Sequence, residues 1–164
     1  MAGCEAKERR ILVAVDEGEE SMYALSWCLN NILVSQNSKD TLILLCAKPP
    51  RPIYTSVDGK GYMFSLDIMV AIDKYNNELA ESVMEKAKRL CREVKVEMRV
   101  ESGDPRDVIC QATEKLGVDM VVLGSHCYGL IQRIFLGSVS NHCVHNAKCP
   151  VLIVKRPKST TPNK

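Results

Sequence analysis

The chain has 164 residues and a formal net charge of +2, with acidic and basic residues interspersed along its length. A chain of this length forms one domain with its own core, and this charge balance gives no sign of nucleic-acid binding. No apolar stretch is long enough to span a bilayer, and the charged first nine residues lack the apolar core of a secretory signal. We therefore expect a cytoplasmic protein with no membrane and no nucleic-acid partner, although the sequence also allows a nuclear pool.

Short apolar runs alternate with segments whose apolar residues recur at helical spacing. The expected strands are 11–15, 41–48, 94–100, 120–123 and 151–154, and the expected helices are 21–35, 66–93, 105–116 and 138–147. This alternation predicts an α/β fold with a doubly wound, five-stranded parallel sheet in a Rossmann-like three-layer α/β/α arrangement. We assign residues 10–156 to this single domain, residues 1–9 to a flexible N-terminus and residues 157–164 to a disordered tail.

The third expected strand differs from the others because apolar and charged residues alternate along it. Such a strand is half exposed and belongs at a sheet edge, which suggests the strand order 3-2-1-4-5. In this order the direction of strand addition reverses between the first and fourth strands. Ligands bind outside the carboxyl ends of the strands at such a point. The residues that leave these two ends are Asp16 and Gly124.

Two clusters of glycine and hydroxyl residues flank the segment between the fourth strand and the last helix. Gly124-Ser125-His126 follows the strand, and Gly137-Ser138-Val139-Ser140 begins the helix. Glycines let the backbone approach a ligand, and the N–H groups and partial positive charge at a helix start hold an anion. The pattern therefore indicates a phosphate site, with a simple strand-ending turn as the alternative. The side chain of Ser138 is expected to cap the helix, a role compatible with ligand binding.

The same segment resembles the nucleotide loop of the universal stress protein family, whose pattern is G-x2-G-x9-G-[ST]. Here Gly124, Cys127, Gly137 and Ser138 occupy the four defining positions, and Cys127 replaces the second glycine. The resemblance covers residues 10–156, nearly the whole chain. It implies a stress-response protein that binds ATP or AMP, with Mg²⁺ as an option beside ATP, and that forms a homodimer.

The resemblance also implies roles for individual residues. Asp16 would contact the adenosine, the backbone of Ala47 would meet the adenine edge, and residues 124–126 would approach the ribose and phosphates. Residues 138–140 would donate hydrogen bonds at the helix start, where Gly137 permits close approach. The complete set of candidate nucleotide-binding residues is Ala14, Val15, Asp16, Ala47, Gly124, Ser125, His126, Cys127, Arg133, Gly137, Ser138, Val139 and Ser140.

Several of these residues have simpler interpretations. Asp16 could cap the first helix, His126 could be an ordinary loop residue, and Arg133 could be solvated rather than bound to phosphate. Cys127 would cost roughly 1 kcal/mol of strain if the family's glycine has a positive φ there, so nucleotide binding would persist with an altered preference or be weakened. A thiol beside an anion site also raises the hypothesis of an oxidant sensor. The long connection 49–65 is either a flap beside the site or an ordinary insertion.

The sequence favours a binding protein over an enzyme, because it contains no G-x4-G-K-[ST] loop and no Ser-His-Asp order. A slow ATP hydrolase and a nucleotide-free, chaperone-like homodimer are the alternatives. The last strand, Val151–Val154, is apolar and is expected at a sheet edge, where it could pair with a second copy. Cysteines inside the apolar segments are expected to be buried reduced thiols, and no metal site is predicted.

Overall fold

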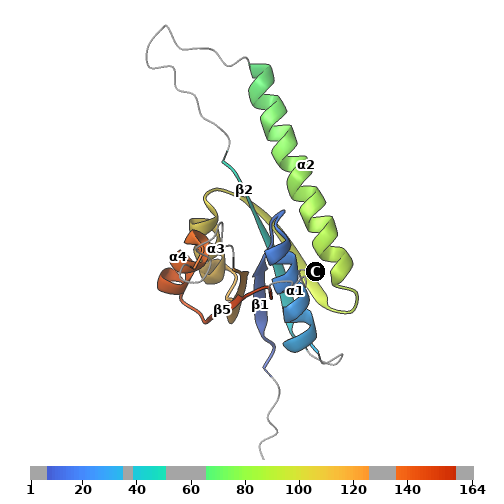
Figure 1. The fold of residues 1–164 in the computed structure, drawn as a ribbon, viewed down its shortest axis with the longest axis vertical. Coiled ribbons are helices and arrows are strands. Elements are labelled where there is room, and N and C mark those ends of the chain that lie inside the picture. The colour runs from blue at the N-terminus through green and yellow to red at the C-terminus, as the bar shows by residue number, and fades with distance from the viewer. Residues whose placement is uncertain (1–6, 35–38, 51–65, 126–135, 158–164) are drawn as a thin grey trace, which may run out of the picture.

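The computed structural model describes residues 7–34, 39–50, 66–125 and 136–157. Its centre is a five-stranded parallel sheet with the order β3-β2-β1-β4-β5 (Figure 1). The strands are β1 Arg10–Ala14, β2 Thr41–Lys48, β3 Lys95–Ser102, β4 Met120–Gly124 and β5 Val151–Val154, and the helices are α1 Glu19–Asn31, α2 Leu66–Leu90, α3 Pro105–Lys115 and α4 Ser138–Asn146. The predicted fold class and strand order are therefore confirmed.

Some element ends differ from the prediction for local reasons. Helix α1 ends at Asn31 rather than at residue 35, and here the N–H groups of Ile32 and Leu33 both donate to the carbonyl of Cys28, so that the regular helical pattern is lost. Strand β3 continues to Ser102 because its pairing with β2 extends as far as Lys48. The start of α3 agrees with the sequence, since the Asp104 carboxylate accepts a hydrogen bond from a first-turn N–H.

The core consists of two layers, one on each face of the sheet. In β2, Leu42 and Leu44 pack with residues of α1 and α2, whereas Ile43 and Leu45 pack with residues of α3 and α4. All four side chains are almost completely inaccessible to water, as expected for a central parallel strand covered on both faces. Within the described residues, no helix is long and apolar enough to cross a membrane.

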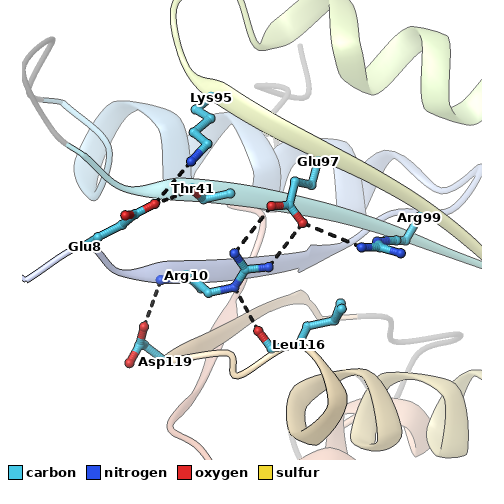
Figure 2. A network of polar contacts seen from close by, with 8 residues as sticks. All are labelled: Glu8, Arg10, Thr41, Lys95, Glu97, Arg99, Leu116 and Asp119. Carbon is cyan, nitrogen blue, oxygen red and sulfur yellow. Dashed lines mark hydrogen bonds and ion pairs between the residues drawn. The ribbon is translucent and has the colours of Figure 1, made fainter.

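A network of hydrogen bonds and ion pairs joins neighbouring elements at the end of the sheet where the strands begin (Figure 2). The Arg10 guanidinium reaches across β2 to the Glu97 carboxylate of β3, with an Nη2–Oε2 distance of 3.1 Å. Its Nε donates to the carbonyl oxygen of Leu116, at the end of α3, over 2.8 Å. The backbone N–H of Arg10 donates to Asp119, just before β4, also over 2.8 Å. The network thus holds β3, the end of α3 and the start of β4 to β1.

At the other end of the sheet, β4 lies unusually close to the first turn of α1. A Cβ atom added to Gly124 would lie 2.6 Å from the carbonyl oxygen of Glu20 and 2.9 Å from the amide nitrogen of Ser21. Both atoms belong to backbone that cannot swing away. Glycine is therefore required at residue 124 by helix packing, whatever the loop beyond it does.

The described cysteines inside the apolar segments follow the sequence expectation, with one partial exception. Cys28, Cys46, Cys91 and Cys143 are buried free thiols, whereas Cys110 is only half-buried. Burial raises the pKa of Cys28 to about 12. Burial, together with the neighbouring Cys110 side chain, raises the pKa of Cys143 to about 12.

We predict that Cys28 and Cys143 resist alkylation in the native protein. With a pKa near 12, the reactive thiolate at pH 8 is roughly a thousandfold scarcer than for an ordinary thiol of pKa about 8.5. Iodoacetamide labelling at pH 8, followed by mass spectrometry of the two peptides, should show slow modification that becomes rapid in denaturant. Equal rates with and without denaturant would contradict the burial.

We also predict that Gly124→Ala destabilises the protein. Forcing a methyl group between β4 and α1 should lower the free energy of unfolding by about 1–3 kcal/mol, measured by urea titration. Gly117→Ala is the comparison variant, because its site has φ +59° and no atom within 4 Å of the added carbon. That variant should lose about 1 kcal/mol through backbone strain alone. A Gly124→Ala protein as stable as wild type would refute the close approach.

Candidate functional site

A cavity of about 380 Å³ opens at the carboxyl ends of β1, β2 and β4. The strand order reverses between β1 and β4 at this point, as the sequence predicted. The starts of α1, α3 and α4 complete the wall. The lining residues are Ala14, Val15, Asp16, Ser21, Leu45, Ala47, Pro105, Ile109, Leu123, Gly124, Gly137, Ser138, Val139 and Ser140.

Most of the described candidate residues meet in this cavity. Asp16 and Ala47 come from the ends of β1 and β2, Gly124 from the end of β4, and the run 137–140 from the start of α4. Ala14 and Val15 also line it. Ser125 is described, but it is absent from the lining residues. His126, Cys127 and Arg133 lie outside the described residues, and so do residues 51–65 of the expected flap.

The apolar part of the cavity wall was not predicted from the sequence. Leu45 and Leu123 reach the cavity from β2 and β4, and Ile109 and Pro105 reach it from the first turns of α3. Leu45, Leu123 and Ile109 are each at most 3% exposed. In the sequence such residues look like ordinary core. The topology is what identifies them as cavity residues, because the helix after edge strand β3 starts at the same end of the sheet as the cavity.

Asp16 is fixed in place by its neighbour Ser21. The Ser21 hydroxyl is buried, accepts from the backbone N–H of Asp16 over 3.0 Å, and lies 3.0 Å from the Gly18 carbonyl oxygen, to which it can donate. The Asp16 carboxylate accepts from the N–H of Gly18 over 2.8 Å. Gly18, not Asp16, is the N-cap residue of α1. Asp16 thus shapes the turn before the helix while its exposed side chain remains at the cavity.

The start of α4 corrects the predicted capping role of Ser138. The N-cap is Gly137, with φ −54° and ψ 154°, and no side chain caps the helix. The carbonyl of Gly137 accepts the first helical hydrogen bond, from the N–H of Asn141 over 2.8 Å. Ser138 is therefore the first helical residue. The first-turn N–H groups of an α-helix have no carbonyl partner inside the helix, and here that turn faces the cavity.

Ser140 connects this helix start to the sheet. Its side chain is buried, and its hydroxyl donates to the carbonyl oxygen of Gly124 over 3.3 Å. The contact joins the first turn of α4 to the end of β4, on the opposite side of Gly124 from α1. Gly124 thus contacts two of the three helices that border the cavity, α1 and α4.

The described part of the cavity combines an apolar wall with polar groups at its rim, an arrangement that can hold a small molecule. One wall is apolar and can pack against a flat ring, while a helix start and a carboxylate provide polar contacts at the rim. Among the described lining residues, Asp16 carries the only ionisable side chain. The described residues also contain no group of three or more His, Cys, Asp or Glu placed to hold a metal ion.

Comparison with known sequences gives a consistent result. Residues 8–155 match the model of the universal stress protein family. A universal stress protein A-like protein from Arabidopsis thaliana is 32% identical over 149 residues, which cover 85% of this chain and 81% of the relative.

Solved structures agree on the fold. Universal stress protein UspA from Lactobacillus plantarum has a TM-score of 0.70 at 19% identity, over 91% of this chain and 99% of that one. A universal stress protein family protein from Arabidopsis thaliana, solved with AMP bound, has a TM-score of 0.62 at 27% identity, over 95% of this chain and 97% of that one. The sequence match, the shared fold and the span of the family model together show that the chain belongs to the universal stress protein family.

Proposed function

We propose that this chain is a cytoplasmic stress-response module that binds an adenine nucleotide, ATP or AMP, in the cavity between β1 and β4. The observation that carries the proposal is the cavity itself, where an apolar wall faces the open first turn of α4. Its volume of about 380 Å³ lies within the range typical of small-molecule sites. The AMP-bound Arabidopsis relative, which aligns with 95% of this chain, supports the choice of ligand.

The nucleotide has one orientation that satisfies both parts of the cavity. The adenine packs against Leu45 and Ile109, and the backbone of Ala47 meets its polar edge. The Asp16 carboxylate accepts a hydrogen bond from the adenosine. The phosphates lie at the start of α4, where backbone N–H groups and the helix dipole stabilise negative charge. Mg²⁺ would accompany ATP through the phosphates themselves.

We further propose that two copies associate through β5. The carbonyls of Pro150 and Val154 point toward β4, because they accept from Val121 and Ser125 over 2.9 and 3.0 Å. Backbone groups alternate in direction along a strand, so those of Val151 and Ile153 point to the outer edge. An apolar edge strand with such groups is a template for a second copy.

Titration calorimetry with ATP, AMP and GTP tests the nucleotide proposal. We expect micromolar binding of the adenine nucleotides and none of GTP. Gly137→Val should abolish binding by placing a branched side chain at the helix start. Asp16→Asn should weaken binding roughly tenfold by removing a charged acceptor. Asp107→Asn is the matched control, since Asp107 is exposed in α3 and is not a cavity residue.

Circular dichroism should show that every variant is folded. A folded wild-type protein that binds no adenine nucleotide would refute the proposal and favour the nucleotide-free interaction module. Phosphate release from ATP in the same samples should stay at background. Turnover that Asp16→Asn abolishes would instead indicate a slow hydrolase.

Sedimentation equilibrium tests the β5 pairing. We expect an assembly of two or more copies at micromolar concentration and a smaller assembly in Val151→Pro. Proline removes an outward N–H from the first residue of the strand while leaving the hydrogen bonds to β4 intact. A monomeric wild-type protein, or an assembly that Val151→Pro leaves unchanged, would contradict pairing through β5.

A further inference from the structure

Strand β3 forms the edge of the sheet opposite β5, is longer than β5, and carries alternating charged and apolar residues. Strand β3 has eight residues, and within the described residues only β2 pairs with it (Figure 1). Met98 and Val100 are 48% and 43% exposed, high values for apolar residues in a strand. An exposed edge of this length can pair with another strand.

The direction of the β3 backbone groups follows from its pairing with β2. The N–H of Gly103 donates to the carbonyl of Lys48 over 2.9 Å, and Ser102 lies opposite Lys48. In a parallel pair, the residues on each side of the opposed residue supply its hydrogen-bond partners. Odd-numbered β3 residues therefore direct their backbone toward β2. The backbone N–H and C=O groups of Val96, Met98 and Val100 point to the open edge.

The side chains of β3 divide between the two faces of the sheet. Val96 packs with the α1 and α2 layer, so Met98 and Val100 face the same side by alternation. The charged residues face the α3 and α4 side, where Figure 2 shows three of them together. In order along this face they are Lys95, Glu97, Arg99 and Glu101.

We propose that two copies of this chain pair through β3, antiparallel, about a two-fold axis at Met98. Lys95 then lies opposite Glu101 of the second copy, and Glu97 lies opposite its Arg99. On the other face Val96 lies opposite Val100, and Met98 lies opposite itself. All charged pairs have opposite sign, and all remaining pairs are apolar.

The backbone groups are compatible with this register. Met98 meets its copy as a hydrogen-bonded pair, because its N–H and C=O groups point outward, and so do those of Val96 and Val100. The charged residues fall at the non-hydrogen-bonded positions, where opposed side chains are closest. Opposed residues are thus matched in charge, face and hydrogen bonding together.

Neighbouring registers fail on the same criteria. A shift of the two-fold axis by one residue toward the N-terminus places Glu97 opposite itself and Lys95 opposite Arg99. A shift by one residue toward the C-terminus places Arg99 opposite itself and Glu97 opposite Glu101. An axis between two residues pairs charged residues with apolar ones. Axes at Val96 and Val100 also pair opposite charges, but they pair fewer residues, so the axis at Met98 is the one that avoids these conflicts while pairing the full strand.

Because β3 and β5 lie at opposite edges, pairing at one edge leaves the other free. A copy that pairs at both edges is joined to two other copies. The β3 contact is also separate from the nucleotide cavity, so it stands or falls independently of the proposed ligand.

Cross-linking across the axis tests the pairing. Met98→Cys places two thiols opposite each other with Cα atoms about 5.5 Å apart, within disulfide range. Val100→Cys is the matched control, since its site is similarly exposed but the two copies lie four residues apart along the strand, about 13 Å. After mild oxidation at micromolar concentration, non-reducing electrophoresis should show a covalent dimer for Met98→Cys only.

Wild type, oxidised in parallel, gives the background from the native cysteines. A dimer yield for Met98→Cys no higher than that of Val100→Cys or wild type would overturn the proposal. That result would mean that the edge charges keep copies apart.

A charge exchange tests the register without disturbing Glu97, which Arg10 holds. Lys95 also pairs with Glu8 of its own chain over 3.2 Å, so the exchange begins at Glu101. In the Met98→Cys background, Glu101→Lys places like charges at two symmetry-related positions and should slow cross-linking roughly tenfold. Adding Lys95→Glu restores opposite charges and should recover the original rate. Failure of the second change to rescue the first would overturn the register.

Discussion

The contact between Gly124 and the first turn of α1 sets the geometry on which the cavity depends. The backbone of Glu20 and Ser21 lies so close that no side chain fits at residue 124. On its other side, the carbonyl of Gly124 accepts from the Ser140 hydroxyl of α4. The end of β4 thus packs between α1 and α4. The turn that carries Asp16 and the start of α4 consequently keep a fixed separation, as a preformed binding site requires.

The two ends of the sheet have opposite characters, and this division explains where a ligand can enter. At the beginning of the strands, Arg10 joins β1 to Glu97 and to the end of α3, and Asp119 joins it to β4 (Figure 2). These contacts hold the strands together at the end of the sheet where they begin. At the carboxyl ends, the strands separate toward different helices, and the reversal of order between β1 and β4 leaves space between the connections.

Sequence patterns were sufficient for the fold because each element repeats one simple signal. Buried strands are continuous apolar runs, and β3 reveals its edge position through alternation, so the order of the strands could be inferred. The polar side of the site followed from the glycine and hydroxyl residues after β4 and at the start of α4, and from Asp16 at the end of β1. Leu45 and Ile109 could not be identified in the same way, because a residue that lines a cavity and a residue that fills a core have the same composition. Ser138 was mistaken for a cap because glycine occupies that position equally well without a side-chain contact.

The alternation along β3 carries more information than its edge position. Any alternation of charged and apolar residues would mark a half-exposed strand, but here the order of the charges is self-complementary when the strand is reversed. The sequence alone does not disclose whether that symmetry can be used, because backbone direction is set by the partner strand. The hydrogen bond from the N–H of Gly103 to the carbonyl of Lys48 shows which β3 residues direct their backbone groups toward β2 and which toward the open edge. It places the outward groups on Val96, Met98 and Val100, the same residues that the charge order leaves facing one another. Hydrogen bonding thus allows an axis at any residue of β3 but not between two residues, and the order of the charges then favours Met98, where the whole strand is paired with opposite charges.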